Sequence, residues 1–471
     1  MKKYIRYILS IMLGILIFAR LNFVLEANYD GNVSMKGFYR LDRDTSDVVF
    51  YGNSHIYGGV NIASLWDEYG ISGYNLSGGI QPLWNSYYNM EETLKYQSPK
   101  VMVVDVYGTH NIEEYSPSAN VIKNVSSMRL SPNKIRNLWN SVPHEEFISH
   151  LFFYPLMHDS YREITKANYD REYNIIGGKW YKGFSPFLTV THYEKLPEAN
   201  EILKKKAPSE KNRKYLDKMV SLAQKHQIDL VFLVVPYAEW QPGEEEVYAW
   251  VEEYAAENNV FFFNGNQHME EMALDPATDY ADFSHLSYDG ASKFTKYFGG
   301  WLKSNYDLED HRGEELYDSW QKYSECWAAY TRNRELAGIT DLDEYISKLK
   351  SSENYVVFVS VSSKYKDNVY VDKLKELAEV DPYDFEYNGT FVIKEGELLY
   401  KTPNEPEYLW YMETDSLDIA AAREYGYEME LLIHDVVQND IENDVTIVVY
   451  DEILDVIADS VFFNRDAIIR R

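Results

Sequence analysis

The sequence lacks several features that would assign it to a class at once. Its 471 residues include one cysteine, Cys326, which excludes an intramolecular disulfide and a cluster of thiolate metal ligands. Basic residues are also few, with 46 Lys and Arg against 75 Asp and Glu, and the formal net charge is −29. Because so negative a surface repels phosphate backbones, we expect no nucleic-acid partner. The sequence contains no internal repeat or low-complexity tract.

An unbroken apolar run of the roughly 20 residues that span a bilayer is also missing. The basic start, Met1–Arg6, precedes an uncharged and mostly apolar segment, residues 7–19, which Arg20 interrupts. Arg20 could snorkel to the interface, so that residues 21–25 complete the span. A cleaved signal peptide is the alternative, but no clear small-x-small cleavage site directly follows the apolar core. The pattern favours an uncleaved anchor at residues 1–29, a cytoplasmic N-terminus and an extracytoplasmic body at the cell membrane.

From Ser46 onward, short apolar strands alternate with amphipathic helices. This alternation predicts an α/β fold with a doubly wound parallel sheet and helices on both faces. In such sheets ligands bind at the carboxyl ends of the strands. The segments expected to meet at that edge are residues 52–54, residues 78–79 and the residues after Tyr107. Strands are expected at 48–51, 73–79, 100–108, 228–237 and 260–265, and helices at 60–70, 82–97, 212–227 and 243–259.

The length is too great for one compact core and predicts two domains with additions. Residues 30–308 carry the α/β alternation, which an aromatic insertion at residues 110–203 interrupts. An insertion of this length over the functional edge is usually a lid or a substrate platform, and a helical layer that only packs is the alternative. Residues 309–345 predict a helical connector. Residues 346–471 predict a smaller α+β or β-rich domain.

Three short motifs predict nucleophilic acyl chemistry. Such chemistry needs a hydroxyl, an imidazole that takes its proton, and a carboxylate that orients the imidazole. We therefore predict Ser54 as the nucleophile, His285 as the base and Asp282 as the orienting carboxylate. The backbone N–H of Ser54 and that of Gly78 or Gly79 would stabilise the oxyanion, since glycine lets the backbone approach a substrate closely.

The same motifs resemble the SGNH/GDSL hydrolase superfamily. They are "GNSH" at residues 52–55, "NLSGG" at residues 75–79 and "DFSH" at residues 282–285. The resemblance implies a flavodoxin-like fold and ester or acyl-transfer chemistry. It is closest to membrane-anchored branches, similar to the DltD-like and alginate-acetylation proteins, which act on envelope polymers. The family's Gly-x-Asn-Asp block is replaced by "DVYGTHN", so the third oxyanion donor would be Asn111 or His110, or would be absent.

Each motif alone has a structural explanation. A Gly-Asn-Ser stretch is more often a plain turn, and a lone histidine such as His285 is more often structural. Their order, each at a strand or helix end, favours a working triad. An α/β-hydrolase elbow would need glycine where Ile56 stands. His55 is expected to be structural or substrate-facing, and His268 with two nearby glutamates lacks convincing ligand spacing, so we expect no metal and no cofactor.

The sequence thus predicts serine-dependent acyl transfer to or from an envelope polysaccharide through an acyl-Ser54 intermediate. The expected partners are that polysaccharide, or another acyl acceptor, and a membrane acyl-donor protein. The 42 tyrosines and 10 tryptophans suit stacking on sugars. A carbohydrate acetylesterase and a non-catalytic envelope scaffold are the alternatives. The C-terminal domain weakly resembles the interleukin-like EMT-inducer domain through "NYVVFVSV" and "GTFVIKEGELLYK", which implies a glycan- or partner-binding module.

Overall fold

The computed structural model divides into two compact units, residues 1–324 and residues 325–471. The division falls within helix α14 (Asp318–Gly338), inside the range expected to be a helical connector. Each unit is described by itself. The structure describes scattered positions before residue 18 and residues 30–110, 113–151, 181–196, 204–240, 243–361, 369–378, 389–402, 408–413, 418–423, 430–433, 436–438, 444–464 and 468–471.

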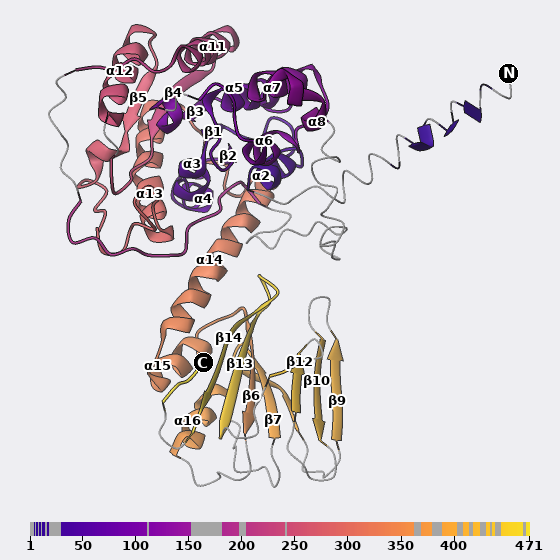
Figure 1. Ribbon diagram of the computed structural model, residues 1–471. Helices are drawn as coiled ribbons and strands as arrows, with labels where there is room; N and C mark the ends of the chain where they lie inside the picture. The colour runs from indigo at the N-terminus through magenta and orange to yellow at the C-terminus, as the bar shows by residue number, and fades with distance from the viewer. Residues whose placement is uncertain are drawn as a thin grey trace. The chain divides into compact units, whose positions relative to one another are not determined.

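The first unit is built on a five-stranded parallel sheet in the order β2-β1-β3-β4-β5 (Figure 1). This is the flavodoxin-like order, so the predicted fold class is confirmed. The strands are β1 (Val48–Gly52), β2 (Gly73–Ser77), β3 (Val101–Asp105), β4 (Asp229–Val234) and β5 (Phe261–Asn264). The helices are α2 (Asp30–Phe38), α3 (Ser54–Gly59), α4 (Ile62–Tyr69), α5 (Leu83–Thr93), α6 (Ser118–Val125), α7 (Pro132–Ser141), α8 (Phe147–Leu151), α11 (Glu210–His226), α12 (Glu244–Glu257) and α13 (Tyr288–Asn305).

The apolar runs of the strands are buried because helices cover both faces of the sheet. On one face, Val104 and Phe232 pack in a core with side chains of α5, α11 and α12. On the other face, the ring of Phe50 lies 6.4 Å from that of Phe298 on α13. Central parallel strands are therefore continuous hydrophobic segments and do not alternate with polar residues.

Local capping signals fix both ends of α4, a helix that lies between β1 and β2 in the chain. Asn61 caps α4 because its side chain accepts hydrogen bonds from the N–H groups of Ala63 and Ser64. The helix ends at Gly70, whose φ of 67° lies in the left-handed region, and a Cβ there would lie 1.8 Å from Asp310 Oδ1. Glycine is therefore required at this turn.

The described part of the insertion begins with a helical layer. Helices α6 and α7 enclose a small apolar core that includes Val121 and Leu138. The indole N–H of Trp84 on α5 donates to the Ser141 hydroxyl on α7 at 3.0 Å. Residues 113–151 therefore pack as an additional helical layer, whereas residues 152–180 and 197–203 lie outside the described residues.

The second unit is α+β with two antiparallel sheets, as the sequence predicted. Successive side chains of its central strand β6 point to opposite faces of the sheet. Val357 and Val359 pack with α15 and α16 on one face. Val356 and Phe358 pack with the other sheet on the opposite face. The sheets are β14-β13-β6-β7-β8 and β12-β11-β10-β9. The elements are α15 (Leu342–Lys350), β6 (Tyr355–Val361), α16 (Val369–Ala378), β7 (Gly389–Lys394), β8 (Glu397–Lys401), β9 (Tyr408–Glu413), β10 (Asp418–Arg423), β11 (Glu430–Ile433), β12 (Val436–Val437), β13 (Val445–Asp451) and β14 (Val456–Phe463).

The expected single-pass membrane anchor at residues 1–29 is contradicted. Among the positions that the structure describes, no helix is both long enough and apolar enough to cross a membrane. The physical reason lies in the sequence itself: Arg20 limits the uncharged run to residues 7–19, which is shorter than the roughly 20 residues that a bilayer requires. Snorkelling of Arg20 was needed to complete the span, and the predicted membrane localisation is withdrawn with it.

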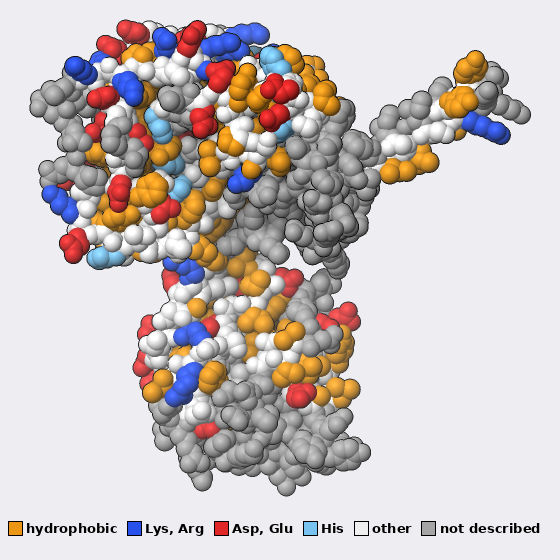
Figure 2. All heavy atoms as spheres, viewed as in Figure 1, with side chains coloured by type: hydrophobic (Ala, Val, Ile, Leu, Met, Phe, Trp, Pro, Cys, Tyr) orange, Lys and Arg blue, Asp and Glu red, His pale blue; other side chains and the backbone are white. Residues whose placement is uncertain are grey.

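Charged side chains of both signs are spread over the visible face of the first unit. Figure 2 shows Asp and Glu side chains interspersed there with Lys and Arg and not gathered into one patch. Some form surface ion pairs, such as Lys296 with Glu68 at 2.6 Å. Exposed ion pairs of this kind contribute little to stability. Burial of apolar side chains against the sheet is therefore the main source of folding free energy in the first unit.

A matched pair of leucine substitutions tests where that free energy originates. Leu233 on β4 is fully buried, whereas Leu130 is 72% exposed. We expect Leu233→Ala to lower the free energy of unfolding by about 2–5 kcal/mol, because the central sheet cannot collapse into the cavity. Leu130→Ala should change it by less than about 0.5 kcal/mol. Urea unfolding followed by circular dichroism measures both, and equal losses would contradict the assignment of the core.

Candidate active site

Ser54 stands at the carboxyl end of β1, on the first residue of helix α3. The side chain of Asn53 caps the helix by accepting the His55 N–H at 2.9 Å. Gly52 precedes them where β1 passes close to β3, and a Cβ at Gly52 would lie 2.6 Å from Asp105 Cβ. In the stretch Gly-Asn-Ser, the glycine therefore ends the strand, the asparagine caps the helix and the serine presents its hydroxyl at the start of that helix.

The structure brings the three predicted triad residues together. The Ser54 hydroxyl oxygen lies 2.7 Å from His285 Nε2, and His285 Nδ1 lies 2.9 Å from both carboxylate oxygens of Asp282. Asp282 and His285 sit on the turn just before α13, whose first residue is Tyr288. Ser54 and His285 are 231 positions apart in the sequence. An uninterrupted hydrogen-bonded chain thus connects hydroxyl, imidazole and carboxylate.

Asp282 is held as a carboxylate. Partial burial acts to raise the pKa of Asp282. The Ser284 N–H donates to its carboxylate at 2.8 Å, and His285 forms further hydrogen bonds with it. These hydrogen bonds outweigh the effect of burial, so the pKa of Asp282 lies below its usual value. The His285 N–H also donates to the same oxygen at 3.0 Å. An ionised Asp282 favours the imidazole tautomer that carries its proton on Nδ1 and leaves Nε2 as an acceptor for the Ser54 hydroxyl.

The expected oxyanion donors separate into two groups. The N–H of Gly78 donates to the Gly52 carbonyl at 3.3 Å and is engaged in the fold. Within the described chain, the N–H groups of Ser54 and Gly79 have no hydrogen-bond acceptor. They are accordingly the better candidates for an oxyanion. Asn111, the third expected donor, lies outside the described residues.

His55 is buried behind the triad and is not placed to act as its base. Its ring stacks on Tyr107 with centroids 3.9 Å apart and lies 5.3 Å from the ring of His285. Burial, and then the neighbouring His285 and His110, hold the pKa of His55 well below its usual value. A neutral His55 adds no positive charge beside His285. Of the structural and substrate-facing roles that the sequence left open for His55, these contacts favour the structural one.

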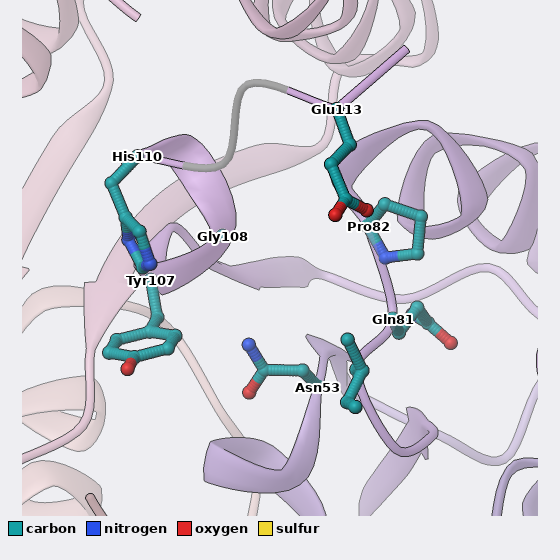
Figure 3. Close-up of a pocket in the computed structure, with 8 residues that line it drawn as sticks. Asn53, Gln81, Pro82, Tyr107, Gly108, His110 and Glu113 are labelled. Atoms are coloured by element: carbon teal, nitrogen blue, oxygen red, sulfur yellow. The ribbon is translucent and has the colours of Figure 1, made fainter. Parts of the chain in front are cut away.

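A pocket of about 380 Å³ opens beside the nucleophile turn. Figure 3 shows the side chain of Glu113 extending toward Pro82, and the amide of Asn53 extending toward Tyr107. A volume of this order is at the lower end of those that hold small molecules. The wall combines apolar and polar groups from three loops, and it consists of Asn53, Ile80, Gln81, Pro82, Tyr107, Gly108, His110 and Glu113.

Asp105 is a buried carboxyl that the motif search did not single out. It ends β3 and accepts the Tyr107 N–H at 3.1 Å. Burial raises its pKa to about 7, although the N–H groups of Tyr107 and Asn53 act in the opposite direction. Its position at the carboxyl end of an apolar strand was the available sequence signal. Its contact with Asn53, the residue before Ser54, exists only because β1 and β3 pair, and the sequence does not show that pairing.

No group of three or more His, Cys, Asp or Glu side chains that could hold a metal ion occurs in the described parts of the chain. His268, which the sequence raised as a metal candidate, has its Nδ1 3.6 Å from Glu271 Oε1 and stacks on Phe263 with centroids 5.0 Å apart. These contacts are those of a side chain packed at the end of β5.

The likeness of this chain to known proteins is remote. No family model matches the chain, and no curated protein matches its sequence. The solved structure of a candidate acylhydrolase from Bacteroides fragilis NCTC 9343 is 14% identical, covers 57% of this chain and 94% of its own, and has a TM-score of 0.29. A gut microbial diltiazem-metabolizing enzyme is 14% identical, with 54% and 48% covered and a TM-score of 0.28. At these TM-scores neither likeness indicates an activity for this chain, and the DltD-like and EMT-inducer resemblances stay predictions.

The raised pKa of Asp105 predicts a pH-dependent stability. The carboxyl of an Asp in an unfolded chain has a pKa of about 3.9. Between about pH 4 and pH 7, therefore, Asp105 of the folded state holds a proton that the unfolded chain releases. The protonated Asp105 side chain therefore makes its full contribution to stability below about pH 4, and this contribution is lost as the pH rises through about 7. We expect Asp105→Asn, which cannot ionise, to gain stability relative to wild type between about pH 5 and about pH 8. Urea unfolding at both pH values measures this.

The exposed residue Asp229 on β4 provides the control for this prediction. Asp229→Asn should follow the wild-type pH profile closely, because the substitution removes no buried carboxyl. Parallel profiles for wild type, Asp105→Asn and Asp229→Asn would contradict a raised pKa at Asp105.

Proposed function

We propose that this protein is a serine-dependent hydrolase of acyl esters, with Ser54 as nucleophile, His285 as general base and Asp282 as its orienting carboxylate. The observation that carries the proposal is the 2.7 Å contact between Ser54 Oγ and His285 Nε2, continued to Asp282 at 2.9 Å. A hydroxyl, an imidazole and an ionised carboxylate in this order perform nucleophilic acyl transfer in several unrelated folds.

In the first half of the reaction, Ser54 Oγ attacks the ester carbonyl carbon while His285 Nε2 takes the hydroxyl proton. The carbonyl oxygen becomes an oxyanion, which the N–H groups of Ser54 and Gly79 stabilise. The bond to the alcohol then breaks, and His285 returns the proton to the departing alcohol oxygen. The product is an acyl ester of Ser54. Asp282 stays ionised and stabilises the transient imidazolium.

In the second half, a hydroxyl compound attacks the acyl-Ser54 carbonyl while His285 Nε2 takes its proton. Water as the attacking group releases a carboxylic acid, and a sugar hydroxyl gives a new ester. In both cases the bond between the acyl carbon and Ser54 Oγ then breaks, and His285 returns the proton to Ser54 Oγ. The triad chemistry is the same, so the choice between hydrolysis and transfer depends on how well the site excludes water and positions an acceptor.

For the substrate we propose an acylated carbohydrate, and transfer onto an envelope polysaccharide is the second candidate reaction. The pocket that Asn53, the neighbour of Ser54 in the chain, helps to line supports a carbohydrate, because it combines the aromatic side chain of Tyr107 with the carboxylate of Glu113 and the amide of Asn53. The membrane anchor that would have placed the site next to an acyl donor no longer supports transfer. Hydrolysis is therefore the primary proposal.

Substitution of the nucleophile tests the reaction class. Ser54→Ala should lower kcat for a small acetyl ester by at least about a thousandfold, while the circular dichroism spectrum is unchanged. Ser304→Ala, which removes an exposed hydroxyl from the end of α13, should have wild-type activity. Labelling of wild type by a serine-directed fluorophosphonate, and its absence in Ser54→Ala, would identify the nucleophile. Full activity in Ser54→Ala, or no labelling of folded wild type, would contradict the proposal and favour a non-catalytic scaffold.

Product analysis distinguishes hydrolysis from transfer. The protein is incubated with an acetyl donor and envelope oligosaccharides, and both free acetate and acceptor mass are followed. We expect acetate release in the wild type and none in Ser54→Ala. A gain of one acetyl mass on an acceptor that depends on Ser54 would establish transfer and displace hydrolysis as the main reaction. Acetate release without any mass gain would exclude transfer to the acceptors used.

A further inference from the structure

Residues 185–193, here called the bracing segment, run beside the loop that carries the triad carboxylate and imidazole. At one end, the Phe187 carbonyl accepts the Tyr288 N–H at 3.0 Å. At the other end, the N–H and hydroxyl of Thr191 donate to the consecutive carbonyls of residues 280–281 at 2.8 and 2.7 Å. Backbone hydrogen bonds on both sides of the loop therefore tie this part of the insertion to the site.

The ring of Phe187 lies against the imidazole of His285. Their centroids are 4.2 Å apart and the ring planes are inclined by 32°. A second contact holds the bracing segment near the nucleophile, because the Ser185 N–H donates to the Tyr57 carbonyl on α3 at 2.8 Å. The bracing segment thus contacts both the helix that begins with Ser54 and the loop that carries His285.

Gly58 on α3 leaves the space that the Phe187 ring fills. A Cβ at Gly58 would lie 2.4 Å from one ring carbon of Phe187 and 2.7 Å from another. Glycine inside a helix ordinarily lowers the stability of that helix relative to alanine. Here that cost accompanies the approach of an aromatic ring to the imidazole.

Phe187 is not a typical core residue, since it is only partly buried. The backbone hydrogen bonds already hold the bracing segment in place without the ring. The hydrogen bonds of His285 to Ser54 and Asp282 hold its two nitrogens at the edge of the ring. The Phe187 ring packs instead on the imidazole face, where it opposes tilting of the ring plane.

We propose that Phe187 is a positioning residue for the reaction, which holds the imidazole plane of His285 so that Nε2 stays directed at Ser54 Oγ. The inference rests on the proposed function. It also assigns part of the insertion a role in catalysis that differs from that of a lid or a substrate platform. Because Phe187 acts on the histidine, its loss should affect turnover and leave ester binding intact.

Substitution of Phe187 is the first test. Phe187→Ala should lower kcat, and the rate of fluorophosphonate labelling of Ser54, by between about tenfold and a hundredfold, with KM changed by less than about threefold. Phe187→Tyr, which keeps a flat ring, should recover most of the rate. Phe187→Leu should recover the melting temperature more than the rate, because it restores apolar volume without a flat face. Leu188→Ala, an exposed change on the same segment, should have wild-type kinetics.

A double-mutant cycle with Gly58 separates positioning from a general loss of packing. Gly58→Ala alone should slow labelling, because the new methyl group displaces the ring. In the Phe187→Ala background there is no ring to displace, so Gly58→Ala should have little further effect. Strictly additive effects of the two substitutions would overturn the inference. So would wild-type kcat in Phe187→Ala, or equal losses in Phe187→Ala and Phe187→Tyr.

The wild-type measurement separates this inference from the proposed function. If folded wild type is not labelled and hydrolyses no ester, the proposed function fails and the inference fails with it. If wild type is labelled at Ser54 and Phe187→Ala is labelled equally fast, the inference alone is overturned.

Discussion

Parallel pairing of the five strands is the constraint on which the rest of the first unit depends. It places the carboxyl ends of β1, β2 and β3 along one edge, so that Ser54, Gly79 and Tyr107 come from three separate strand ends to one place. Parallel strands need helical crossovers, and those helices bury both sheet faces. The rigid core thus provides fixed mounting points for loops that carry the polar groups.

Burial assigns different protonation states to the ionisable groups at that edge. Asp282 is partly exposed and well hydrogen-bonded, so it remains ionised beside His285. Asp105 is buried with few donors and its pKa is raised to about 7, while burial keeps His55 neutral. One charged carboxylate is therefore directed at the imidazole, whereas His55 is neutral and Asp105 is only partly ionised at neutral pH. Separation of this kind is typical of sites that carry out acid–base chemistry.

The described part of the insertion combines the helical layer that the sequence offered as one alternative with a contact to the triad loop that the sequence did not predict. Its helices α6 and α7 pack on α5 as an added layer, while the bracing segment lies along the Asp282–His285 loop. The Phe187 ring is what connects the insertion to the proposed chemistry. The functional proposal depends on the triad and on the pocket that Asn53 helps to line.

The sequence by itself determined the strands, because unbroken apolar runs are stable only when buried on both faces, and it identified Ser54, Asp282 and His285 because their chemistry is explicit in the side chains. The flavodoxin-like order could be expected from the alternation and the motif resemblance. Only the tertiary structure decided that Gly78 is engaged with Gly52 while Gly79 is not. It also decided that Phe187 lies on His285, a contact between residues almost 100 positions apart. Such contacts depend on how distant segments pack, and no local pattern of residues encodes that packing.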